Sequence, residues 1–270
     1  MGKPAMTIRP PAVAGTFYPA TEGALTHQVD QLLAQAKPPR LEPRALIVPH
    51  AGYRYSGPIA ASAYALLSKA SRKPTRVVLL GPAHTVDLRG LALPGSDAMA
   101  SPLGEVPIDA AGVSVAAAFP QVVTSKLAHA TEHALEVQLP FLQRVLGELA
   151  VVPLLVGRAA AEEVEEVVDA LWVEPGTLLV VSTDLSHYLP YETCRALDAE
   201  TAGRILAFDV LNLGDERACG MGGLRGFLAV AKKRRLEGHL LDLRNSGDTA
   251  GDRWRVVGYG AFAFCTAQGS

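Results

Sequence analysis

The sequence has little charge, little cysteine and no long apolar run, and each shortage excludes a class of protein. Of its 270 residues, 19% are charged and 49% are hydrophobic, a balance that a disordered chain does not show. Three cysteines without a C-x-x-C pair exclude a disulfide framework and are typical of a reducing compartment. Neither a run of about 18 apolar residues nor an apolar leader is present, so we expect a cytoplasmic protein without a membrane span.

The charges are nearly balanced, with 25 Lys and Arg against 27 Asp and Glu and a net charge of -2. This balance gives no reason to expect a nucleic-acid or membrane partner. Walker A and G-x-S-x-G motifs are also missing, and the glycines that follow Gly220 have the spacing G-x-G-x-x-x-G, which is not a dinucleotide fingerprint. We therefore expect no nucleotide cofactor.

Short apolar runs alternate with helical segments, a pattern typical of a sheet covered by helices. We expect a single α/β domain over residues 1–270, with a central, largely parallel or mixed sheet, and a short hairpin over residues 87–104. The predicted strands are 45–49, 76–81, 149–156, 177–182, 239–243 and 255–264. The predicted helices are 22–35, 58–68, 109–118, 132–146, 160–171, 191–207 and 222–235, with Pro58 and Pro190 at helix starts.

Three of the predicted strands end in residues that can ligate a metal or transfer a proton. His50 follows the first, His84 the second, and Asp184 and His187 follow the strand over 177–182. Parallel strands in an open sheet gather such residues at one edge. A lone histidine after a strand is more often a hydrogen-bonded turn residue, and Asp184 alone fits a turn or a helix cap. Three such strand ends together indicate a cleft.

Cys219 lies in a glycine-rich turn, ACGMGGLRGF, that leads into a predicted helix. The amides and dipole at a helix start favour the thiolate, which is the form that ligates a metal. We expect the remaining cysteines and most remaining histidines to be structural: Cys194, Cys265, His27, His129 and His239.

His129 and His133 are spaced i, i+4, as two zinc ligands on one helix face would be. A metalloprotease HEXXH motif is excluded because position 130 is Ala. Glu132 and Glu136 suit the start of the predicted helix, where the dipole favours acidic residues. His133 could instead orient a ligand or a charge in the cleft.

Six motifs, taken together and in this order, resemble the MEMO family, whose bacterial and archaeal members are also called AmmeMemoRadiSam system protein B. The motifs are RPPAVAGTFYP, VPHAGYRYSGPIAASAY, LLGPAH, EHALEVQLPFL, STDLSHY and CGMGG. The resemblance implies a fold similar to class III extradiol dioxygenases, which are non-haem iron enzymes. It further implies that His50, His84 and Cys219 are metal ligands and that Asp184 and His187 line the cleft. The family name suggests a radical-SAM system partner.

The residues alone leave a His/His/Asp site and a His/His/Cys site open, and the resemblance favours Cys219. A thiolate softens the site and shifts its preference toward Cu(I) or zinc as well as iron. The cofactor that we expect is a metal ion, with iron or copper favoured and zinc possible. His187 would then be free as a general acid/base, with Asp184 fixing its tautomer.

Three functions follow from this sequence. The first is a metal-dependent redox enzyme, of dioxygenase-like type, acting on a small organic or modified-residue substrate. The second is a non-catalytic module that binds a peptide or protein in the same cleft, lined by Tyr18, Tyr53, Tyr55 and Tyr188. The third is a metal-dependent hydrolase with His187 as base.

Overall fold

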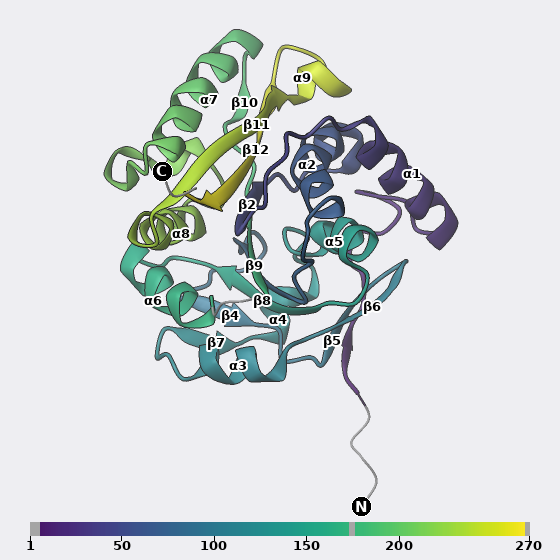
Figure 1. The fold of residues 1–270 in the computed structure, drawn as a ribbon, viewed down its shortest axis with the longest axis vertical. Coiled ribbons are helices and arrows are strands. Elements are labelled where there is room, and N and C mark those ends of the chain that lie inside the picture. Colours follow the sequence, from purple (N-terminus) through teal and green to yellow (C-terminus); the bar gives the residue numbers. More distant parts are fainter. Residues whose placement is uncertain (1–5, 173–175, 268–270) are drawn as a thin grey trace, which may run out of the picture.

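The computed structural model describes residues 6–172 and 176–267, which form two β-sheets and the helices that cover them (Figure 1). The large sheet has nine strands in the order β10-β12-β2-β9-β3-β8-β4-β7, with β11 paired to β12, and the small sheet has the order β1-β5-β6. The strands of the large sheet are β2 (Ala45–Val48), β3 (Arg76–Pro82), β4 (Leu91–Leu93), β7 (Val122–Thr124), β8 (Ala150–Val156), β9 (Thr177–Ser182), β10 (His187–Leu189), β11 (Leu236–Asn245) and β12 (Val256–Thr266). The small sheet contains β1 (Ile8–Arg9), β5 (Ala98–Ser101) and β6 (Gly104–Pro107).

The centre of the large sheet is parallel, and its flanks are partly antiparallel. Strands β2, β9, β3 and β8 run parallel as consecutive neighbours, with Ala45 opposite Leu179 and Arg76 opposite both Thr177 and Ala150. Strand β12 is antiparallel to β2, β10 and β11. The predicted α/β fold class with a mixed sheet is therefore confirmed, and the carboxyl ends of β2, β9 and β3 lie side by side.

Helices cover both faces of the large sheet because its strands are apolar on both faces. In β2, Leu46 and Val48 belong to one core with α1, α2 and α5, whereas Ala45 and Ile47 belong to a second core with α6, α7 and α8. Figure 1 shows these two groups of helices on opposite sides of the sheet. The helices are α1 (Glu22–Gln35), α2 (Tyr53–Ser68), α3 (Ala110–Ala117), α4 (Lys126–Ala130), η1 (Glu136–Gln138), α5 (Leu139–Leu146), α6 (Ala161–Leu171), α7 (Tyr191–Leu206), η2 (Val210–Asn212), η3 (Asp215–Arg217), α8 (Met221–Lys233) and α9 (Ser246–Thr249).

The structure departs from the predicted helix over 132–146. Residues 131–135 form a turn, and regular α-helix begins only at Leu139, with Pro140 in its first turn. The Glu132 carboxylate accepts the N–H groups of His133 and Ala134, at 2.7 and 2.9 Å, and these bonds replace helical ones. His133 therefore lies on a loop.

Two smaller expectations also change. Pro58 lies inside α2, which begins five residues earlier at Tyr53, rather than at the helix start. The hairpin expected over 87–104 lies further along the chain, over 98–107, where β5 pairs with β6. Strand β4, at the start of the expected range, instead joins the large sheet between β8 and β7. In the described part of the chain, no helix is long and apolar enough to cross a membrane.

Candidate metal centre

Adjacent parallel strands deliver the predicted residues to one edge of the sheet. His50 lies two residues beyond the end of β2, His84 two beyond β3, and Asp184 two beyond β9. Because β9 pairs with both β2 and β3, the three side chains emerge next to one another.

Three histidines form the core of the site. His50, His84 and His133 each offer a ring nitrogen within 4.8 Å of those of the other two. Their ring centroids are 5.2 Å apart for His50 and His84, 5.5 Å for His50 and His133, and 5.0 Å for His84 and His133. His50 is buried, with 2% of its surface exposed, whereas the His84 and His133 side chains are 31% and 22% exposed. A metal ion held here would thus meet solvent on the side of His84 and His133.

The hydrogen bonds of Ser182 identify the tautomer of His50. The Ser182 hydroxyl donates its single proton to the Ala134 carbonyl at 2.7 Å and accepts a bond from Gln138 Nε2 at 2.8 Å. Its contact of 3.0 Å with His50 Nδ1 must therefore be one in which the imidazole donates. The proton is on Nδ1, and Nε2 carries the lone pair that a metal needs.

Cys219 lies against this free nitrogen. Its Sγ is 3.2 Å from His50 Nε2 and accepts the Asp184 N–H at 3.3 Å. The turn that carries Cys219 and Gly220 packs closely against Thr183. A Cβ on Gly220 would lie 2.8 Å from the Thr183 Cβ, so only glycine fits at this position. The three-histidine group does not include the thiol, but Cys219 is placed to extend it.

The thiolate that we expected at Cys219 is not favoured in the metal-free protein. The glycine-rich turn leads into α8, as we expected, with Gly220 as the N-cap. However, burial and then the nearby Asp184 charge raise the pKa of the Cys219 thiol to about 12. Desolvation therefore outweighs the helix dipole. The sulfur would lose its proton only as it ligates a metal ion.

Asp184 and His187 line the same cleft but do not form the expected pair. Asp184 Oδ1 accepts the His50 N–H at 2.8 Å, so the carboxylate holds the turn after β2. Burial raises the pKa of Asp184, and the bond from His50 opposes that rise. Among the described residues, no hydrogen bond joins Asp184 to His187, so the carboxylate does not fix the tautomer of that ring. His187, half-buried on β10, faces the cavity.

The cleft is a cavity of about 800 Å³ that all six predicted site residues line. Phe17, Tyr55, Tyr188, Arg255 and Tyr259 complete much of its wall. Two of the four tyrosines that we expected there lie elsewhere: Tyr18 bonds to Glu136, and Tyr53 donates to the Val137 carbonyl at 2.6 Å.

The sequence did not indicate that Glu132 lies beside two of the three histidines. This residue is 2% exposed, and its Oε1 lies 3.0 Å from His84 Nδ1 and 3.3 Å from His133 Nδ1. Burial raises the pKa of Glu132, but hydrogen bonds from His84 and Ala134 outweigh it and lower the pKa to about 2. Glu132 directly precedes His133 in the sequence, which could have indicated that the two interact. We instead assigned the carboxylate to the start of the predicted helix.

The residues that we predicted to be structural include two buried ones with clear partners. His129 is 1% exposed and its Nε2 meets the Ala92 carbonyl at 2.8 Å, so it shares no site with His133. Cys194 is buried in α7, where its Sγ lies 3.1 Å from Asp198 Oδ2.

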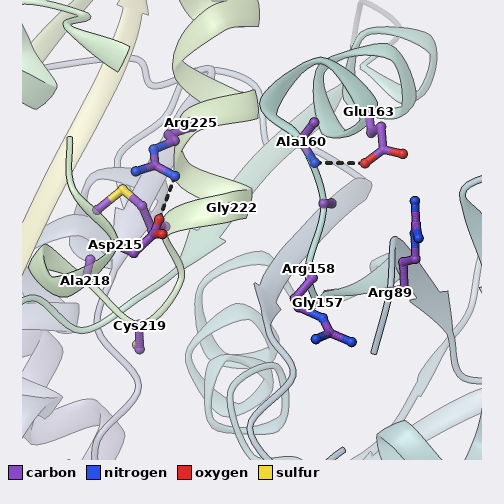
Figure 2. Close-up of a pocket in the computed structure, with 12 residues that line it drawn as sticks. Arg89, Gly157, Arg158, Ala160, Glu163, Asp215, Ala218, Cys219, Gly222 and Arg225 are labelled. Carbon is purple, nitrogen blue, oxygen red and sulfur yellow. Dashed lines mark hydrogen bonds and ion pairs between the residues drawn. The ribbon is translucent and has the colours of Figure 1, made fainter. Parts of the chain in front are cut away.

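A second cavity, of about 780 Å³, also borders Cys219 (Figure 2). Its charged lining residues are Arg89, Arg158, Glu163, Asp215 and Arg225. Most of these already have partners: Arg225 pairs with Asp215 at 2.6 Å, Arg158 with Asp87 at 2.9 Å, and Glu163 accepts the Ala160 N–H at 2.8 Å. The metal-ligating groups gather instead in the histidine-lined cavity.

Comparison with known proteins gives consistent results along almost the whole chain. The family model for Memo-like proteins matches residues 9–263. A MEMO1 family protein of Methanopyrus kandleri is 35% identical over 95% of this chain and 98% of its own length. Another from Archaeoglobus fulgidus is 36% identical over 95% of this chain and 99% of its own length.

A solved structure resembles the fold alone. It is the crystal structure of uncharacterized protein JW3007 from Escherichia coli K12, with a TM-score of 0.53 and 15% identity, covering 81% of this chain and 99% of that one. Because the family model and relatives at about 35% identity match almost the whole chain, the chain belongs to the MEMO family.

Proposed function

We propose that this protein binds one metal ion through the Nε2 atoms of His50, His84 and His133, with the Cys219 sulfur as a further ligand. The observation that carries the proposal is that these three histidines offer nitrogens within 4.8 Å of one another while a hydroxyl or carboxylate oxygen lies beside each Nδ1. Histidine ligands commonly have their second nitrogen engaged in this way.

The donor set selects among metals. Imidazole suits iron, copper and zinc, and a thiolate shifts the preference toward Cu(I) and zinc. We favour iron or copper because both support redox chemistry on an organic substrate, which zinc does not. Bound in this site, such a metal would supply one-electron chemistry.

The rest of the cavity would bind the substrate and manage protons. Tyr188 is 62% exposed, and the Arg255 guanidinium lies 5.1 Å from its ring centroid, so an aromatic and a cationic surface flank the entrance. These groups suit a small organic substrate, or a modified residue, that carries an acidic group. His187 lies on the same wall and would serve as the general acid or base.

Anaerobic loading with Fe(II), Cu(I) or Zn(II), followed by measurement of bound metal, tests the proposal. We expect about one ion per chain in the wild type and none in a His50→Ala, His84→Ala double variant. Equal and negligible binding by both proteins would contradict the metal site.

Oxygen uptake with catechol-type substrates then separates a redox enzyme from a binding module. Ester cleavage by the zinc-loaded protein that depends on His187 would instead identify a hydrolase.

A further inference from the structure

We propose that Glu132 is a positioning residue, a single buried carboxylate that orients two of the three histidines at once. This inference rests on the proposed metal site. Oε1 of Glu132 lies 3.0 Å from His84 Nδ1 and 3.3 Å from His133 Nδ1, although the two histidines are far apart in the sequence. The two rings stack nearly parallel, with centroids 5.0 Å apart and an interplanar angle of 13°.

Glu132 also holds the backbone that carries both rings. Oε2 accepts the His84 N–H at 2.6 Å, and Oε1 accepts those of His133 and Ala134 at 2.7 and 2.9 Å. The carboxylate therefore joins the end of β3 to the 131–135 turn. Because every one of these protein groups donates to it, the carboxylate must be an acceptor on both oxygens.

The turn itself has little freedom to move away from β3. Arg9 donates to the Glu132 carbonyl and, through Nε, to the His129 carbonyl at 3.0 Å. On the other side, a Cβ on Gly81 would lie 2.7 Å from Leu135 Cδ2, so the turn packs directly on the strand that delivers His84.

These contacts determine which ring nitrogen of His84 and of His133 would be free to bind a metal ion. A carboxylate that accepts a bond from Nδ1–H leaves Nε2 as the ligand atom and raises its basicity. Ser182 likewise keeps the proton of His50 on Nδ1, because its hydroxyl donates to the Ala134 carbonyl and can only accept from the ring. All three rings would then present Nε2 to one point before any metal arrives.

Glu136, four residues later, provides a matched control. It too is a buried carboxylate, with none of its surface exposed, but its partners are Arg9, the Tyr18 hydroxyl and the N–H groups of Ala12 and Val13. Among the described residues it contacts no imidazole. Loss of its charge should affect the packing of the N-terminal segment but not the orientation of the ligands.

The test compares Glu132→Gln with Glu136→Gln in two measurements. In the first, Zn(II) affinity is titrated against a competing chelator. We expect Glu132→Gln to bind Zn(II) roughly 10- to 100-fold more weakly than the wild type. This is the typical effect of removing a residue that hydrogen-bonds to a metal ligand without touching the metal. Glu136→Gln should lower the melting temperature and leave the affinity at the wild-type value.

The second measurement uses long-range 1H–15N NMR of the metal-free proteins to identify the protonated nitrogen of each ring. In the wild type and in Glu136→Gln, we expect His84 and His133 to carry the proton on Nδ1. In Glu132→Gln, the amide NH2 replaces one acceptor oxygen, so a share of Nε2–H should appear in at least one ring. A merely structural role would not move this signal.

Unchanged tautomers in folded Glu132→Gln, or equal loss of affinity in the two variants, would overturn the positioning role. If Glu132→Gln does not fold, Glu132→Asp provides the same comparison, because its shorter carboxylate keeps the charge but loses reach. If the wild type itself binds no Zn(II), the metal proposal fails, and the tautomers of the metal-free protein still decide the role of Glu132.

Discussion

The two cavities that border Cys219 have nearly the same volume, about 800 and 780 Å³, but their linings differ in kind. In the histidine-lined cavity, His50, His84 and His133 offer ring nitrogens within 4.8 Å of one another, and an oxygen atom lies beside each Nδ1. In the second cavity, Arg225 is already paired with Asp215, as Figure 2 shows. Arg158 is paired with Asp87, which lies outside the lining. The volumes of the two cavities therefore do not distinguish them. What distinguishes them is the group of side chains that can ligate a metal ion, which lines the first cavity.

The largest effect should come from removing a ligand from the histidine-lined cavity. We expect His84→Ala to weaken metal binding by more than the roughly 100-fold that a lost outer partner costs. His27→Ala, a change on the exposed face of α1, is the control and should bind metal normally. Isothermal titration with Zn(II) measures both, and wild-type affinity in His84→Ala would remove the contrast between the cavities.

The next effect concerns the residue that the two cavities share. Cys219→Ser should weaken Cu(I) binding at least about tenfold, or 1.4 kcal/mol, because a hydroxyl is a poor ligand for a soft ion. Cys194→Ser removes a buried thiol in α7, away from both cavities, and should change stability but not Cu(I) affinity. Competition with a Cu(I) chelator gives the two affinities. Similar values for both variants would mean that Cys219 is not a ligand.

A moderate effect is expected from a histidine outside both cavities. Burial lowers the pKa of His129 to about 4, against an ordinary value of 6.5, so between these pH values the unfolded chain binds a proton that the folded protein does not. The free energy of unfolding of the metal-free protein should therefore fall as the pH falls from 6.5 to 4, by up to about 1.4 kcal/mol per pH unit from this group.

His129→Gln keeps a donor for the Ala92 carbonyl but does not titrate. Urea unfolding at several pH values should give a smaller pH dependence for this variant, by up to one proton. Its metal affinity at pH 7 should match the wild type. An unchanged slope would show that His129 does not titrate between pH 4 and 6.5 in the way its burial implies.

The smallest effect should come from the second cavity. Arg158 is 76% exposed and its ion pair with Asp87 is equally open to solvent. Arg158→Ala should change stability by less than about 0.5 kcal/mol and leave metal binding unaltered. A large loss of bound metal in this variant would show that the two cavities are not separate in function.

Much of the sheet could be predicted from the sequence because its strands are short apolar runs with clear ends. The strand over 177–182 was predicted with the bounds of β9, and the residues beyond β2, β9 and β3 do meet at one edge. Parallel topology makes that meeting a consequence of local pattern.

The 131–135 turn could not be predicted in the same way. Its apolar and acidic residues fit a helix start, and the bonds that replace the helix run from Glu132 to His84 and from Arg9 to the turn. These partners are distant in the sequence, so the local pattern of apolar and polar residues cannot predict these bonds. For the same reason, nothing local indicated that Ser182 holds His50.

Anomalous diffraction from crystals of the metal-loaded protein, recorded at the absorption edge of the bound ion, tests the central claim most directly. We expect one peak at about 2.0–2.1 Å from the Nε2 atoms of His50, His84 and His133, with the Cys219 sulfur within ligand distance. A peak bound to Nδ1 atoms, a peak in the second cavity, or no peak in a loaded crystal would contradict it.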